Sequence, residues 1–119
     1  MSIRRATLEA VKSCFRQHKV GAVVAKGSRI LSTGYNSRQH SSLLQTSTRH
    51  AEAAAILKIL KERRQHDLVG ADLFVTRITG GGRVGMAKPC RACEGLARSV
   101  GIRKVFYTTN ENTTEEWKL

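Results

Sequence analysis

His50-Ala51-Glu52 opens one helix expected in this sequence, and Pro89-Cys90-Arg91-Ala92-Cys93 opens another. Cys90 and Cys93 are three residues apart, so on a helix they share one face. Pro89 suits a first-turn position, because it lacks the N–H that would go unbonded there. The unpaired amides and the dipole at a helix N-terminus favour a thiolate over a thiol. The sequence therefore predicts two helix N-termini that converge on one point.

The two stretches together supply the groups of a hydrolytic zinc site. Three protein ligands leave a zinc ion one open position for water, and a spare carboxylate can take a proton from that water. We therefore expect one Zn2+ per chain, held by His50, Cys90 and Cys93, with Glu52 outside the metal shell. A closed structural zinc site would need a fourth ligand, for which the other histidines are His18, His40 and His66. A redox role for the cysteine pair would leave the histidine and the glutamate unexplained.

The elements on either side of these helices alternate between strand and helix. The pattern predicts an N-terminal helix over 2–17, a hairpin of strands 21–25 and 29–35, a strand over 72–79, a loop over 80–85, a strand over 103–109 and a short final strand after a turn at 110–112. In the first helix, Ile3, Leu8, Val11 and Cys14 are the positions expected to face the core. Such an order predicts a mixed sheet covered by helices.

Composition narrows the class of protein further. The 119 residues suit one domain, and no segment reaches the roughly 18 apolar residues of a membrane span. The N-terminus lacks the apolar run of a signal peptide, so we expect a cytoplasmic protein without a membrane partner. Lys and Arg outnumber Asp and Glu by 21 to 9, a formal net charge of +12. Such an excess favours a phosphate-bearing partner, although a merely solvated basic surface is the alternative.

The chain resembles the cytidine/deoxycytidylate (CMP/dCMP-type) zinc-dependent deaminase superfamily. The resemblance runs roughly from Val20 to Tyr107, and its landmarks are Val20–Val24, Gly34–Asn36, His50–Glu52, Pro89–Cys93 and Gly101–Val105. It implies a single domain over residues 1–119, an α/β fold built as a three-layer α/β/α sandwich around a mixed, roughly five-stranded sheet. The few residues after Tyr107 are too short for a further helix and a parallel strand. We therefore expect a short antiparallel last strand, which is typical of the cytidine deaminase branch.

The resemblance also implies roles for individual residues. His50, Cys90 and Cys93 would ligate zinc, and Glu52 would carry protons. The family's substrate contacts fall here on Asn36 (sugar or base), the backbone of Ala51 (base edge) and His18 (stacking on the base). Lys88 and Arg83 place positive charge near the mouth of the implied pocket, where a phosphate would suit them. The alternatives are a turn-closing role for Asn36, a surface position for His18 and ordinary solvated cations at 83 and 88.

The reaction implied is hydrolytic deamination of cytosine to uracil, by attack of a zinc hydroxide at C4 with loss of ammonia. The substrate would be a nucleotide or single-stranded nucleic acid. Three alternatives stay open: an enzyme for free dCMP or cytidine only, an adenosine deaminase on tRNA, and a non-catalytic zinc module that binds nucleic acid. Arg91-Ala92 stands where the tRNA enzymes usually have an x-Met pair, which favours cytosine over adenine. A homo-oligomer is compatible with all of these.

Overall fold

The computed structural model describes residues 2–13, 15, 18–37 and 50–119. The predictions made for Cys14 and His40 lie outside the described residues. Along the chain the elements are α1 (Ser2–Ala10), β1 (His18–Lys26), β2 (Arg29–Tyr35), α2 (Ala51–Lys61), the 3-10 helix η1 (Gln65–Leu68), β3 (Asp72–Thr79), β4 (Val84–Gly85), α3 (Arg91–Ser99), β5 (Lys104–Thr108) and β6 (Thr114–Lys118). No helix in the described part of the chain is long and apolar enough to span a membrane.

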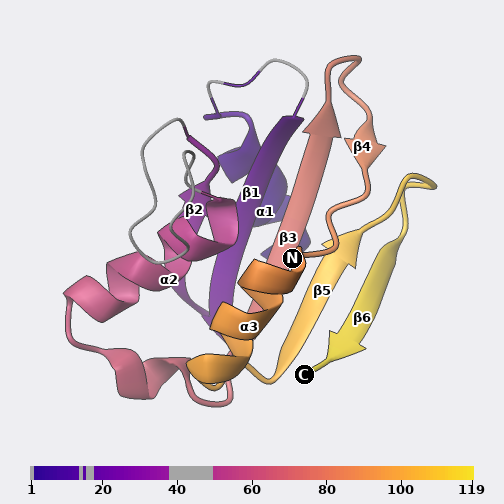
Figure 1. Cartoon of the computed structure of the whole chain (residues 1–119). Coiled ribbons are helices and arrows are strands. Elements are labelled where there is room, and N and C mark those ends of the chain that lie inside the picture. The colour runs from indigo at the N-terminus through magenta and orange to yellow at the C-terminus, as the bar shows by residue number, and fades with distance from the viewer. Residues whose placement is uncertain (1, 14, 16–17, 38–49) are drawn as a thin grey trace.

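The sheet is mixed, and helices cover both of its faces (Figure 1). Its strand order is β2-β1-β3-β5-β6, with β4 paired to β3 off this path. Only the pairing of β3 with β5 is parallel, and the other ladders are antiparallel. Helix α1 lies on one face, and α2 and α3 lie on the other. The predicted three-layer α/β/α fold is therefore confirmed.

The last strand and the segment 80–85 both extend the sheet, but the sequence predicts only the first of them. The last strand, β6, is antiparallel to β5, as predicted, with Thr108 opposite Thr114. The segment 80–85 was expected to be entirely loop, but Gly85 pairs with Arg77 and Val84 pairs with Ile78. Val84 and Gly85 form the short strand β4. The glycine run allows the tight turn that brings β4 back onto β3, and Gly82 takes a positive φ of 80° there.

The main core lies between the sheet and the helices α2 and α3. Strand alternation places Leu73 and Val75 of β3 in this core, together with Val105 of β5. Helix α2 contributes Ile56 and Ile59, which are completely buried. Leu57 and Leu60 of the same helix are only partly buried, and Leu60 packs against the edge of this core.

Helix α1 packs with a different face from the one predicted. Ala6 and Ala10 are fully buried, whereas Leu8 and Val11 are 61% and 59% exposed. The cause is Gly21 of β1, because a Cβ there would collide with the backbone of Ala6 and Ala10. A helix that approaches a strand so closely can bring only small side chains to the contact. The prediction from hydrophobic spacing was therefore wrong about the buried face of α1, because that spacing favoured the larger side chains.

The rotation of α1 also buries Glu9, which the sequence assigned to the solvent face. Glu9 is 2% exposed, and its Oε2 lies 2.6 Å from Nζ of Lys12. Burial pushes the pKa of Glu9 upward, but hydrogen bonds from Lys12 and Thr33 outweigh it, so the pKa lies below its ordinary 4.5. The folded state is thus stabilised by the charged form of Glu9.

The pH dependence of stability should reveal this charge. A carboxyl whose pKa is lowered on folding stabilises the protein above its unfolded pKa, and that contribution is lost as the pH falls through the folded value. We expect Glu9→Gln to lower the free energy of unfolding by about 1.5 kcal/mol at pH 7, the size of a hydrogen bond to a charged group. The difference between variant and parent should shrink below pH 4.5. Urea unfolding at pH 7 and pH 3.5 measures it, and a difference that grows on acidification would contradict the assignment.

Helix α2 lies directly on β2, which fixes the position of its N-terminus. The hydroxyl of Ser32 donates to the carbonyl oxygen of Ala55 at 2.8 Å, and Nζ of Lys58 donates to the carbonyl oxygen of Thr33 at 2.6 Å. At the next residue of β2, a Cβ on Gly34 would come within 2.6 Å of backbone atoms of Ala51 and Ala55. The glycine therefore lets the helix approach the sheet at the point where His50 and Glu52 begin it.

We predict that Gly34→Ala destabilises the fold by about 1–3 kcal/mol, the usual cost of overpacking. Because the added methyl pushes on α2, the start of that helix should be displaced as well. Gly81→Ala is the matched control, since a Cβ at Gly81 meets nothing within 4 Å. Thermal unfolding of both variants tests this, and equal melting temperatures would show that α2 is not held as the structure describes.

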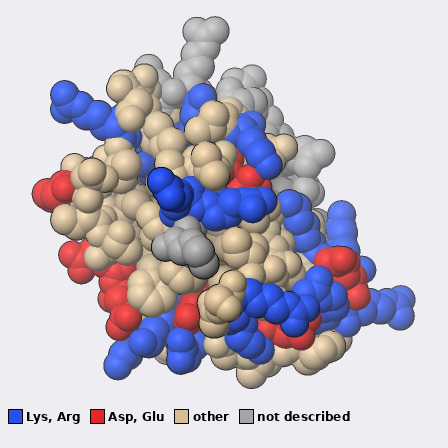
Figure 2. Space-filling view, turned by 180° about the vertical axis from the view of Figure 1, so that it is seen from behind, with Lys and Arg blue, Asp and Glu red and all other residues tan. Residues whose placement is uncertain are grey.

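The face that carries α1 is seen in Figure 2. Lys and Arg side chains form several separate groups there, with Asp and Glu between them. Elsewhere in the described chain, acidic side chains pair with some of the basic ones, as in Arg103 with Asp72 and Lys104 with Glu116. The basic excess seen on this face is thus interrupted by acidic side chains.

Candidate active site

Two helix N-termini meet above the sheet, as the sequence predicted. His50 is the N-cap residue of α2, and Cys90 is the N-cap residue of α3, each with an extended backbone. Cys93 follows in the first turn of α3, so both sulfurs lie on the same side of that helix. Pro89 comes one residue before the N-cap, not at the first helical position that the sequence analysis gave it.

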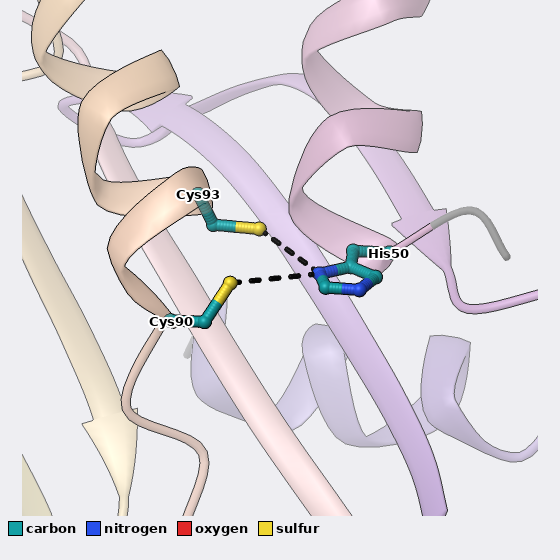
Figure 3. Close-up of side chains that lie close together, drawn as sticks. All are labelled: His50, Cys90 and Cys93. Carbon is teal, nitrogen blue, oxygen red and sulfur yellow. Dashed lines mark hydrogen bonds between the residues drawn. The ribbon is translucent and has the colours of Figure 1, made fainter. Parts of the chain in front are cut away.

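The side chains of these three residues point toward one another (Figure 3). Nδ1 of His50 lies 3.3 Å from Sγ of Cys93 and 3.8 Å from Sγ of Cys90. Their possible ligand atoms all lie within 4.8 Å of one another. One imidazole nitrogen and two sulfurs so close together form a donor set that suits Zn2+.

The surroundings of Cys93 add a physical reason for a cation at this place. Cys93 is completely buried, and burial raises the pKa of its thiol far above the ordinary value, with the charges of Glu52 and Cys90 acting in the same direction. A thiolate here needs a positive charge to offset the loss of water. The residues present therefore fit a zinc ion. Among the described residues, this group of metal-binding side chains has no fourth member.

Glu52 lies in the first turn of α2, beside the metal-binding group but outside it. Its side chain is nearly inaccessible, at 6% exposure for the residue. Burial raises the pKa of Glu52 above its ordinary range, against smaller opposing effects of its own backbone N–H, His50 and Cys93. A carboxyl group whose proton affinity is raised by burial is suited to receive and return a proton.

A cavity of about 410 Å³ opens next to this group. It brings together seven of the residues singled out from the sequence: His18, Asn36, His50, Ala51, Glu52, Lys88 and Cys90. Arg83 is exposed in the turn before β4 and is not among the described residues that line the cavity. The remaining lining residues are Phe15, Val20, Arg77, Met86 and Ala87.

Asn36 ties the end of β2 to the start of β1. Its Oδ1 accepts a hydrogen bond from the N–H of Val20 at 2.9 Å, and its Nδ2 donates to the carbonyl oxygen of His18 at 2.6 Å. The residue is 7% exposed and lines the cavity. An amide NH2 carries two hydrogens. The second one leaves Asn36 a donor for a ligand, in addition to its role at the strand end.

His18 begins β1 at the rim of the cavity. Burial lowers the pKa of its ring below the ordinary value, and the charges of Arg77 and His50 act in the same direction. The ring therefore stays neutral at pH 7, a state in which it can stack against a base.

Arg77 is a charged lining residue that was not predicted from the sequence. It lies on β3, two positions after Val75 and four after Leu73, which both belong to the main core. Successive residues of a strand alternate between faces, so Arg77 shares their face. A cation that continues a buried apolar alternation at the end of a strand was the available signal.

Comparison with known protein families identifies the family of this chain. Residues 2–109 match the sequence profile described as the cytidine and deoxycytidylate deaminase zinc-binding region. The chain belongs to this family. The expected resemblance is thereby confirmed, and so is the enzyme class, a hydrolase that acts on C–N bonds. The zinc-binding family and the cluster of His50, Cys90 and Cys93 together support a single zinc ion per chain.

Individual relatives agree with this assignment. A deoxycytidylate deaminase of Mycobacterium phage D29 is 34% identical over 125 residues, which cover 86% of this chain and 87% of the relative. The crystal structure of a dCMP deaminase from cyanophage S-TIM5 in its apo form has a TM-score of 0.70 at 27% identity and covers 91% of this chain and 79% of its own. The same enzyme in complex with dCMP and dUMP has a TM-score of 0.64 at 25% identity, covering 90% and 77%.

A third relative is similar in fold alone. The cytidine deaminase from Burkholderia pseudomallei has a TM-score of 0.74 at 20% identity and covers 98% of this chain and 89% of its own. The present chain thus combines sequence similarity to dCMP deaminases with a fold that dCMP deaminases and cytidine deaminases share. Within the family, a non-catalytic zinc module and an adenosine deaminase on tRNA are not favoured.

Proposed function

We propose that this deaminase converts dCMP and water to dUMP and ammonia. The observation that carries the proposal is the buried carboxyl of Glu52 beside the group formed by His50, Cys90 and Cys93, with Glu52, His50 and Cys90 lining one cavity. The names of the phage relatives at 34% and 27% identity support dCMP as the substrate. The cavity volume of about 410 Å³ also lies within the usual range for small-molecule sites.

In the proposed reaction His50, Cys90 and Cys93 would hold the zinc ion, which when bound would lower the pKa of a water molecule so that its oxygen can attack the C4 carbon of cytosine once a proton has been removed. Glu52 accepts the proton of that water and gives it to the ring nitrogen N3. A second proton then passes through Glu52 to the amino group, which leaves as ammonia while the C4 oxygen becomes a carbonyl. The raised pKa of Glu52 suits both directions of transfer.

The remaining lining residues are proposed to place the base. The start of helix α2 presents the backbone of Ala51 to the base edge, and Asn36 offers its second amide hydrogen to the sugar or the base. His18 would stack on the ring from the rim, and Lys88 lies at the cavity wall. These contacts orient C4 toward Glu52 and the zinc-binding residues, and they limit the space for water.

The experiment that tests the function compares three substrates. Purified zinc-loaded protein is incubated with dCMP, with deoxycytidine and with a single-stranded oligonucleotide that contains cytosine, and uracil formation is followed. The proposal expects the highest kcat/KM for dCMP. No uracil from any of the three substrates, with zinc bound, would overturn the proposed function.

Single-stranded nucleic acid is a second candidate because of the net charge of +12. A polynucleotide would contact many cations, and its binding would weaken steeply with salt. Preferential turnover of the oligonucleotide, with a strong salt dependence, would favour this candidate over the free nucleotide.

A further inference from the structure

Arg77 is placed in the cavity by the register of β3. Its neighbours on the same face, Leu73 and Val75, are completely buried in the core beneath α2 and α3. Arg77 continues that row to the point where the cavity opens, and it lines the cavity together with His50, Glu52 and Cys90. The sheet therefore delivers a guanidinium into the same space as the catalytic group.

The guanidinium of Arg77 has unused hydrogen-bonding capacity. Its Nε is buried and has no hydrogen-bond partner among the described residues. A buried donor without an acceptor is costly, and a charged donor more so. Seven ion pairs join basic and acidic side chains of the described chain, but none of them involves Arg77. An anionic ligand would satisfy this group.

The backbone of Arg77 is held on both sides. Its N–H donates to the hydroxyl oxygen of Thr108 at 3.3 Å, and the same hydroxyl donates to the carbonyl oxygen of Gly85 at 2.8 Å. Gly85 lies opposite Arg77 in the ladder, and a Cβ there would stand 3.5 Å from Cδ of the arginine. Strands β3, β4 and β5 therefore fix the base of the side chain, which reduces the entropy lost when it binds a ligand.

The other cation of the cavity wall is differently placed. Lys88 is exposed, and its Nζ lies over the ring of Trp117, 4.6 Å from the centroid. Its charge is thus shared with solvent and with an aromatic face. Arg77 is the partly buried cation, and its planar fork matches the oxygens of a phosphate better than an ammonium does.

We propose that Arg77 binds the 5′-phosphate of the nucleotide and so makes the enzyme prefer dCMP to deoxycytidine. This inference rests on the proposed function. Of the charged side chains that line the cavity in the described part of the chain, Glu52 is negative and lies beside the zinc-binding residues, whereas Arg77 and Lys88 are positive. Cytosine and deoxyribose carry no charge, so the phosphate is the part of the substrate that a partly buried guanidinium recognises.

The test compares Arg77→Met with the parent enzyme on dCMP and on deoxycytidine. Methionine keeps much of the apolar stem but removes the charge. We expect kcat/KM for dCMP to fall about 100-fold, the effect of a lost charge-assisted bond, while kcat/KM for deoxycytidine changes less than about 3-fold. Arg77→Lys should recover part of the loss. The control is Arg29→Met, an exposed arginine at the start of β2 that does not line the cavity.

A binding measurement keeps this inference separate from the proposed function. Calorimetry with dUMP and with deoxyuridine needs no turnover, and we expect Arg77→Met to weaken dUMP about 100-fold and deoxyuridine hardly at all. Equal weakening of both ligands, or no weakening of either, would overturn the role of Arg77. Absence of deamination with this binding difference intact would overturn the function and leave the phosphate site standing. Zinc content and melting temperature show whether the variant is folded.

Discussion

Replacement of Glu52 by glutamine is expected to lower kcat for dCMP by about 10³-fold or more while zinc stays bound, because positioned proton transfer contributes about 10²- to 10⁴-fold to a rate. Glutamine has the shape of glutamate but cannot accept the proton of the attacking water. Two proton transfers pass through this one carboxyl in the proposed reaction, which places the loss toward the upper end of that range. Glu52→Ala should be equally inactive.

The measurement is single-turnover uracil formation, together with zinc content by elemental analysis. Glu94→Gln is the matched control, because Glu94 lies in the first turn of α3 as Glu52 lies in the first turn of α2. Glu94 pairs with Arg98 at 2.9 Å and does not line the cavity. A Glu52→Gln variant that keeps a tenth or more of the parental rate would show that another group carries the protons.

The position of the proposed catalytic residues, Glu52 beside His50, Cys90 and Cys93, could be predicted largely from local rules. A proline before two cysteines at helical spacing predicts a helix start, and His50 before an alanine-rich run predicts another. The alternation of Leu73, Val75 and their neighbours then gives β3 its true bounds, Asp72–Thr79. These patterns depend on residues near one another in the chain, so the two helix starts and a helix-covered mixed sheet could be inferred from them. The three layers were implied by the family resemblance, and the convergence of the two helix starts by the zinc ligands that they share.

The errors arose where a contact joins distant parts of the chain. The apolar spacing of α1 favours Leu8 and Val11, but the approach to Gly21 admits only the methyl groups of Ala6 and Ala10. The sequence of the helix alone does not indicate this close approach to Gly21. Arg77 was missed for a related reason. Its alternation with Leu73 and Val75 places it on their face of β3, but its significance depends on a cavity whose other lining residues come mostly from β1, the start of α2 and residues 86–90.

Removal of zinc is expected to abolish turnover and to lower the melting temperature together. A metal that binds only the folded state stabilises it by about 4 kcal/mol when its free concentration is about 1,000 times Kd, so chelation should lower the melting temperature by roughly 10 °C or more. The physical reason lies at Cys93, where a buried sulfur without a cation is left with a strongly raised pKa. Acid should release the metal as well, because protons compete for the two sulfurs and the imidazole.

The decisive comparison is between chelation of the parent and substitution of a proposed ligand. Added Zn2+ should restore activity and melting temperature to the chelated parent at one ion per chain, but not to Cys93→Ser or His50→Ala. Glu52→Gln separates the two roles, since it should respond to chelation with the same loss of stability as the parent while remaining inactive. If chelation stops catalysis in the parent but leaves its melting temperature unchanged, the metal does not connect α2 to α3. The proposed ligand set from both helix starts would then be wrong, because an ion bound by His50, Cys90 and Cys93 must hold the two helices together.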